Sequence, residues 1–352
     1  MRQLVPDARA TAVPDMTQRA STASSHPLVR LLASPAGRAL LALVLVLLVG
    51  VVFNADGAFF KIGTHRDALR QASVYGILAC GLTLVIITGG IDLAVGSVLA
   101  LVAVCGAKLA IHWSWPAIAV VLACLLIGGA CGGTCGLLAA RLRVQPFIAT
   151  LAMMVFARGL AKYASGGMKV STAVQNADGS YRYVDVPALF RAIDTRILGD
   201  NVSMVSVVFA VCFVLAWLAL ARHRWGRQLY AIGGNEDAAR LSGVPVMAAK
   251  AAAYVACGLF AAVAGLCQVA QEQQGDPEAG WGYELTGISM VVIGGTSLMG
   301  GRGGMGLTLL GVLTIGYLEK ILSINAVPEA GRLMLTGAII VVAVLTQGRK
   351  RI

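Results

Sequence analysis

Long apolar segments recur along this chain, and they restrict its fold more than any other feature. A helix needs about 20 such residues to cross the hydrocarbon core of a bilayer. A span must also be helical, because lipid offers no partner to an open backbone. The expected spans are residues 36–53, 68–89, 92–111, 116–140, 146–164, 202–221, 250–270, 285–298, 305–322 and 333–347. The sequence therefore predicts an all-α polytopic membrane protein with about ten transmembrane helices, some of them short or broken.

The low content of charged residues also favours a membrane protein over a soluble one. Charged residues make up 13% of the chain, whereas a soluble domain has about 25%. The polar residues 1–35 are expected to be a disordered cytosolic tail, residues 36–348 a transmembrane domain, and residues 349–352 a basic cytosolic tail. Basic side chains within expected spans, such as Arg158 and Lys162, mostly lie near the span ends, so we expect them to snorkel toward the interface. Arg158 and Lys162 have no carboxylate nearby in the sequence, so they do not resemble a proton relay.

Arginine is concentrated in alternate connections between the spans. With the N-terminus inside, the cytosolic side receives Arg141, Arg143, Arg222, Arg224, Arg227, Arg240, Arg302, Arg349, Lys350 and Arg351. The largest outside loop, residues 166–201, balances its basic residues with acidic ones. An excess of basic residues marks the cytosolic side, so both termini are predicted to be cytosolic. This arrangement explains the net charge of +11 without a nucleic-acid partner.

A polar segment, residues 222–249, separates two of the expected spans. Asn235 suits the N-cap of a short helix over 236–242, Gly243 suits a left-handed end, and Pro245 prevents continuation. So short a helix is marginal alone in water. It is either a capped connector or a docking element for a partner outside the membrane. Docking is favoured because a simple turn needs far fewer than the 28 residues present.

Three ordered motifs give the chain a family resemblance. The polar segment carries Ala231, Gly233, Asn235, Ala238, Ala239, Ser242, Gly243 and Val244 in the pattern A-x-G-x-N-x-x-A-A-x-x-S-G-[IV]. Residues 88–97 read TGGIDLAVGS and residues 293–303 read IGGTSLMGGRG. Together they resemble permeases of bacterial ABC sugar importers of the ribose, xylose and galactose type, within the branched-chain amino-acid permease superfamily.

The resemblance implies a transmembrane permease domain over 36–348, with 222–249 as its cytosolic coupling segment and 166–201 as its periplasmic loop. It implies a bacterial inner-membrane protein that works as a pair, either a homodimer or two related chains. The partners would be two ATP-binding subunits, or one tandem ATPase, and a periplasmic sugar-binding protein. The expected ATPase-coupling residues are Gly234, Asn235, Glu236, Asp237, Ala238, Ala239, Arg240, Ser242 and Gly243, with Glu236, Asp237 and Arg240 the exposed candidates.

We expect no catalytic group, cofactor or metal in this chain, so it is not expected to be an enzyme. The glycine-rich residues 294–306 lack the Lys-Ser/Thr of a P-loop, which assigns ATP and Mg²⁺ to the partner ATPase. Glycines in both motifs suit a broken helix. The pathway or hinge candidates are Gly89, Gly90, Asp92, Gly96, Gly294, Gly295, Gly300 and Gly301.

Two points stay open on the sequence alone. Asp92 is either an N-cap for the span over 92–111 or a polar group near the transport pathway, because an acid among apolar residues needs a reason. The substrate is a monosaccharide, which the TGGIDLAVGS motif favours. The alternatives are another small polar solute such as a branched-chain amino acid, or a secondary carrier without an ATPase, which would need acids near mid-membrane.

Overall fold

The computed structural model describes residues 34–175 and 178–348, and this part of the chain is mostly helical, with two short antiparallel strand pairs. Its helices are α2 Pro35–Val52, α3 Ile62–Ile87, α4 Val95–Ala107, α5 Ala117–Gly136, α6 Pro146–Ser165, α7 Ala188–Asp194, α8 Met204–Ala221, α9 Arg224–Gly234, α10 Glu236–Leu241, α11 Val246–Glu272, α12 Tyr283–Gly294, α13 Met305–Ile324 and α14 Glu329–Gly348. A 3₁₀ turn covers Ala58–Phe60, and π-helical turns over Lys108–His112 and Leu137–Arg141 extend α4 and α5.

Ten of these helices coincide with the ten expected spans, so the prediction of a polytopic all-α membrane protein is confirmed. Within the described residues, eight helices are long and apolar enough to cross a membrane. α12, with 12 residues, is shorter, and α14 occupies the last expected position. α2 exposes Leu45, Leu48 and Val52, as a helix in contact with lipid would.

The core is centred on α11, which packs against α3, α4 and α5. Small residues allow the close contact with α5: a Cβ at Gly128 would overlap the carbonyl of Gly258 across the interface, and one at Gly258 would overlap that of Gly128. Such contacts are typical of membrane helices, because small residues let two backbones approach. The buried apolar side chains of α3 and α4 complete this core.

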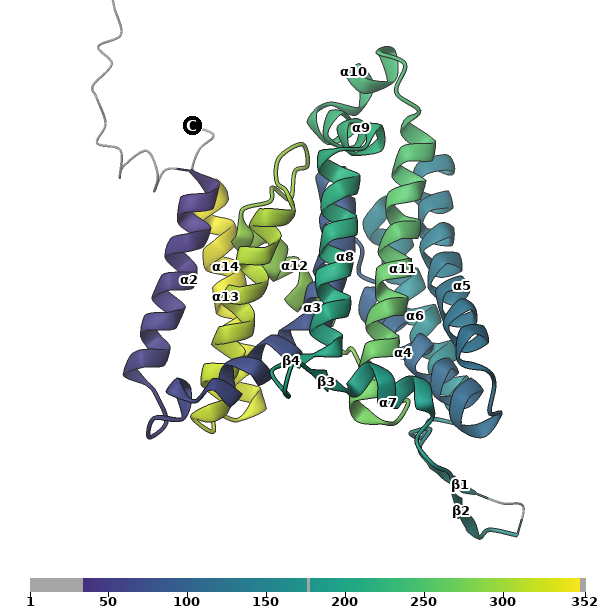
Figure 1. Cartoon of the computed structure of the whole chain (residues 1–352). Coiled ribbons are helices and arrows are strands. Elements are labelled where there is room, and N and C mark those ends of the chain that lie inside the picture. The colour runs from purple at the N-terminus through teal and green to yellow at the C-terminus, as the bar shows by residue number, and fades with distance from the viewer. Residues whose placement is uncertain (1–33, 176–177, 349–352) are drawn as a thin grey trace, which may run out of the picture.

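Figure 1 shows that the connections divide between two ends of the helical bundle. α9 and α10 lie at one end, where α2 begins and α14 ends; we call this the α10 side. At the opposite end lie α7 and the antiparallel hairpin of β1 Ala173–Gln175 with β2 Tyr181–Tyr183. We call this the hairpin side. Nearby, β3 Arg196–Ile197 pairs with β4 Val202–Ser203. The predicted large loop and the predicted polar segment therefore lie at opposite ends.

Two irregular segments enter the interior between helices. Residues 88–94 join α3 to α4, and residues 273–282 join α11 to α12. The second segment closely contacts the start of α4, where a Cβ at Gly96 would overlap the carbonyl of Gly280. Irregular backbone at membrane depth is tolerated only where protein or a water-filled cavity surrounds it.

Arg158 holds the second irregular segment in place, and the expectation that it snorkels is wrong. Its side chain is buried and donates hydrogen bonds to the backbone oxygens of Pro277, at 2.5 Å, and Ala279, at 2.7 Å. Its guanidinium also lies 5.9 Å from the ring centre of Trp281. Lys162, one turn further along α6, pairs with Glu278 at 2.5 Å. Both partners are more than 110 residues away in the sequence, so local spacing gave no sign of them.

Candidate functional site

The polar segment forms two helices, not one. α9 was not predicted, although its apolar residues Leu229 and Ile232 recur at helical spacing and are buried against the bundle. The ring nitrogen of His223 accepts from Trp225 N–H at 3.2 Å and caps the start of α9. The Trp225 indole N–H donates to the backbone oxygen of Ala249 at 3.0 Å. α9 is thereby fixed to both the bundle and the start of α11.

α10 begins at the predicted residue, Glu236, and ends one residue earlier than predicted, at Leu241. The Asn235 side-chain oxygen accepts from Ala238 N–H at 3.0 Å, which confirms the N-cap. Gly243 adopts the expected left-handed conformation, with φ +81°, and Val244 N–H donates to the oxygen of Ala239 at 3.0 Å. Ser242 is the C-cap, not the last helical residue. The caps satisfy the ends of a six-residue helix that has little packing of its own.

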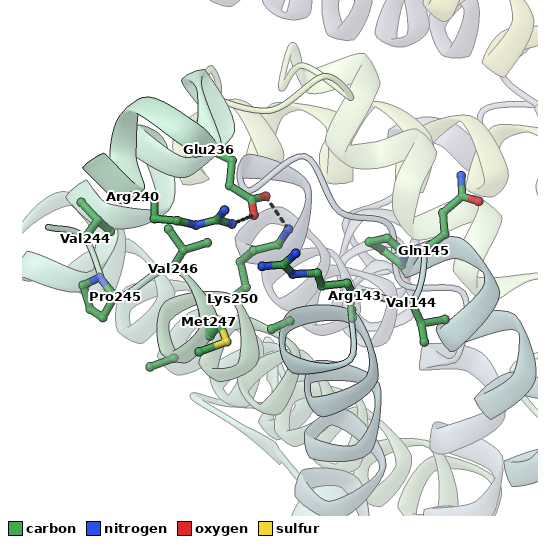
Figure 2. Close-up of a pocket in the computed structure, with 14 residues that line it drawn as sticks. Arg143, Val144, Gln145, Glu236, Arg240, Val244, Pro245, Val246, Met247 and Lys250 are labelled. Atoms are coloured by element: carbon green, nitrogen blue, oxygen red, sulfur yellow. Dashed lines mark hydrogen bonds and ion pairs between the residues drawn. The ribbon is translucent and has the colours of Figure 1, made fainter. Parts of the chain in front are cut away.

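The charged residues of α10 are engaged with one another and with α11 (Figure 2). The Glu236 carboxylate accepts from Arg240 and from Lys250, both at 2.9 Å. Asp237 lies 3.6 Å from Arg240 and keeps 87% of its side chain exposed. Leu241 is not among the predicted coupling residues, yet it is 90% exposed at the end of α10. Its exposure could have been suspected from the sequence, because Leu241 is a large apolar residue in a short, otherwise polar helix.

A groove of about 700 Å³ lies beside α10. Figure 2 shows Glu236, Arg240 and Lys250 on one wall, and the turn that carries Arg143 and Gln145 on the other. The groove therefore combines charged rims with an apolar base that includes Ala139, Val246 and Met247. A groove of this kind suits a protein side chain or a short helix, because charged rims orient a partner while apolar contacts hold it.

All three motifs converge beneath α9, at a cluster that we call the glycine junction: Ile87, Gly89, Gly233, Gly300 and Gly301. Gly301 N–H donates to the oxygen of Ile87 at 2.9 Å. A Cβ at Gly300 would lie 2.7 Å from the backbone nitrogen of Gly89. A Cβ at Gly233 would overlap both the oxygen of Ile87 and the nitrogen of Gly301. α9 therefore rests directly on both glycine-rich segments.

Not every predicted hinge residue belongs to this junction. Gly294 and Gly295 end α12, where Gly294 packs against the backbone of Leu307 in α13. Gly90 faces the Tyr254 hydroxyl, and Gly96 meets Gly280. Gly234, a predicted coupling residue, has open space around the position of a Cβ. The close approach is made by its neighbour Gly233.

Asp92 is buried in the break between α3 and α4, but it is not the N-cap of α4. That helix begins at Val95 after Ala94, and the Asp92 carboxylate accepts from Ala94 N–H at 2.9 Å. The carboxylate thus satisfies a backbone donor within the irregular segment. Tyr254 is close by, since Gly90 packs against its hydroxyl, for which the described residues offer no hydrogen-bond partner.

Within residues 34–175 and 178–348, no three His, Cys, Asp or Glu side chains gather as a metal site would require. The groove and the glycine junction instead join an exposed polar helix to two breaks in the transmembrane helices. This arrangement is that of an integral membrane protein with a polar helix outside its transmembrane bundle.

Comparison with known proteins identifies the family. Residues 66–344 match the family described as branched-chain amino acid transport system / permease component, and the chain belongs to this family. It is 39% identical over 313 residues to the ribose import permease protein RbsC of Escherichia coli K12, covering 87% of this chain and 92% of that protein. It is 33% identical to the fructose import permease protein FrcC of Rhizobium meliloti over 319 residues, covering 88% and 84%.

A third relative extends the range of sugars. The chain is 29% identical over 352 residues to the xylose transport system permease protein XylH of Escherichia coli K12, covering 87% of this chain and 90% of that protein. No solved structure matches the chain. Because these relatives are covered almost end to end, the similarity extends over the whole permease and not only over its motifs.

Proposed function

We propose that this permease is the membrane-spanning subunit of an ATP-driven importer that carries a monosaccharide across the bacterial inner membrane. The observation that carries the proposal is the near full-length similarity to ribose, fructose and xylose permeases. The family description names branched-chain amino acids, so such an amino acid is the second candidate substrate. The absence of paired mid-membrane acids in the sequence argues against a secondary carrier.

The α10 side would face the cytosol, because the arginine-rich connections lie there. Each permease would bind an ATP-hydrolysing partner, either one of two subunits or half of a tandem ATPase, through α10 and the adjacent groove. A second permease copy or a related chain would complete the pore. A periplasmic sugar-binding protein would deliver sugar on the hairpin side, where Asp178 and Lys169 belong to the mixed-charge loop.

Energy would pass from the ATPase to the membrane through contacts that are already in place. Movement of α10 would move α9, because Asn235 joins the two helices directly. α9 rests on the glycine junction, so its motion would displace the break before α4 and the loop before α13 together. Such coupled rigid elements, moving around breaks in helices, suit alternating access between outward and inward states.

The proposal is tested by reconstituting the permease in proteoliposomes with the ATPase and the sugar-binding protein that co-purify with it. We expect uptake of D-ribose, D-xylose or D-fructose that requires ATP and persists after ion gradients are collapsed. Uptake of L-leucine alone would establish the second candidate, and uptake lost with the ion gradient would establish a secondary carrier. The variants Asn235→Leu and Gly243→Pro should abolish coupling; full uptake with both would refute the role of α10.

A further inference from the structure

A second cavity lies in the hairpin-side half of the bundle, far from α10. It encloses about 370 Å³, within the roughly 300–1,000 Å³ of small-molecule sites. Its walls come from the first half of α3, the end of α11, the start of α12, the second half of α13 and the start of α14. All five parts lie toward the hairpin side, so the cavity opens toward the outside in the proposed orientation.

The walls are too polar for an acyl chain. They include the amides of Gln71, Gln268 and Gln271 and the hydroxyl of Thr286. Gln271 donates to the backbone oxygen of Arg70 at 3.4 Å. Because an amide carries two N–H donors and a carbonyl acceptor, this long single bond leaves Gln271 able to donate and accept again. Neutral groups of this kind are suited to hydroxyl groups.

Aromatic rings form a second part of the lining. The rings of Tyr75 and Tyr283 meet with their centres 4.4 Å apart, inclined at 43°. Trp281 stands at the rim with 77% of its surface exposed, and Arg158 holds it by the cation–π contact. The two hydroxyl groups of Tyr75 and Tyr283 are hydrogen-bonded to one another, and that of Tyr283 also to Gln268. The ring faces are suited to packing against the C–H faces of a sugar ring.

Three charged residues line the cavity: Arg332 and Glu319 face one another, and Glu329 is exposed. Arg332 lies 4.0 Å from Glu319, and Glu319 accepts from the Thr336 hydroxyl at 3.1 Å. The Nε atom of Arg332 is buried and has no hydrogen-bond partner among the described residues. One donor is therefore unsatisfied in the lining. An uncharged ligand that accepts a hydrogen bond would satisfy the Arg332 Nε donor and would leave the Arg332–Glu319 ion pair unchanged.

The cavity is closed toward the α10 side. Met290, which lines its inner end, is almost completely buried. Gly287 packs against the Leu82 side chain, and Leu78 of α3 is also buried there. A solute that enters from the hairpin side would therefore stop at this level until α3 and α12 move apart.

We propose that this cavity is an outward-facing binding site for an uncharged monosaccharide, with Gln71, Gln271 and Thr286 bonding its hydroxyls and Tyr75, Tyr283 and Trp281 contacting its ring. The proposal rests on the proposed function. The sugar would occupy the site after release from the binding protein and before the membrane helices rearrange. Neither the motifs nor the predicted hinge residues touch this site.

The first test is uptake of D-ribose by the reconstituted complex. Gln71→Leu, which removes a hydrogen bond to the sugar, and Tyr283→Leu, which removes an aromatic contact with its ring, should each lower uptake at limiting sugar by about tenfold. Tyr163→Leu is the matched control, because Tyr163 lies on α6 with 86% of its surface exposed and outside the cavity. Uptake by both cavity variants equal to that of the control would overturn the proposal.

The second test measures occupancy on a chain that keeps the lining otherwise intact. Ser323→Cys, at an exposed lining position to which the proposal gives no role, is labelled with a small methanethiosulfonate in the assembled complex, with and without D-ribose. Ribose should slow labelling severalfold, and L-leucine should not. Equal protection by leucine, or protection by added phospholipid but not by sugar, would overturn the proposal. If the unaltered complex transports no sugar at all, the proposed function fails; if it transports sugar without protection, only this site fails.

Discussion

Two adjacent glycines at the end of α9 have different surroundings, and this difference yields a matched pair of variants. A methyl group at Gly233 would overlap the backbone of Ile87 and Gly301, whereas Gly234 has open space. We expect Gly233→Ala to cost about 1–3 kcal/mol, as overpacking does, and to impair ATP-dependent uptake. Gly234→Ala should be neutral or slightly stabilising, because alanine favours helix.

Thermal unfolding in detergent and uptake in proteoliposomes check both variants. Equal unfolding temperatures and equal uptake for Gly233→Ala and Gly234→Ala would show that α9 does not press on the glycine junction. The sequence alone could not separate these residues. The contacts of Gly233 reach residues that lie more than 60 positions away on either side, and no local rule connects them.

Leu241 provides a second prediction at the scale of one residue. It is 90% exposed on α10, so Leu241→Ala should change stability by less than about 0.5 kcal/mol. If it enters a groove on the ATPase, its removal should weaken ATPase binding by about tenfold, as for an apolar anchor at an interface. Leu198→Ala, at an exposed leucine on the hairpin side, is the control. Unchanged ATPase affinity in Leu241→Ala would exclude it from the interface.

At the scale of elements, the irregular segment between α11 and α12 depends on Arg158. Arg158→Leu removes both hydrogen bonds to the oxygens of Pro277 and Ala279 and leaves them buried, which costs about 1–3 kcal/mol for each unsatisfied group. Lys162→Leu is the comparison, because the Lys162–Glu278 pair is about half exposed and such pairs contribute about 0–1 kcal/mol.

We therefore expect Arg158→Leu to unfold at a clearly lower temperature than Lys162→Leu and to transport poorly. Because Arg158 also orients Trp281, D-ribose uptake should fall in the Arg158 variant even at a temperature where it remains folded. Unfolding temperatures that do not differ between the two variants would show that the segment is held by other contacts.

The elements differ in how far the sequence predicts them. Apolar length identified all ten spans, and the caps of α10 followed from side chains within a few residues of the helix ends. α9 was missed because its polar residues and its place beside α10 concealed its apolar face. The depth of residues 273–282 was not predictable either, since it depends on Arg158 from another helix. Local rules thus determined element type, while long-range contacts determined the irregular segments that join the elements.

At the scale of the whole molecule, the two ends of the bundle differ in charge, and this difference predicts the orientation. The start of α2, the end of α14 and α10 share one end of the bundle, and the hairpin lies at the other (Figure 1). Arginine-rich connections lie on the α10 side, which therefore should face the cytosol. The binding protein and the ATPase would then act on opposite ends, and the cavity between α3 and α12 would open toward the binding protein.

Cysteine labelling in intact cells with a membrane-impermeant maleimide tests this orientation. Asp178, beside the hairpin, and Asp237, on α10, are both exposed, so cysteine at either position should leave the fold unchanged. The native cysteines lie within transmembrane helices and are buried or half-buried, which keeps background labelling low. We expect Asp178→Cys to react from outside and Asp237→Cys to react only after the membrane is permeabilised. The reverse pattern would place α10 outside the cell, where no ATPase could reach it, and the coupling mechanism would fail with it.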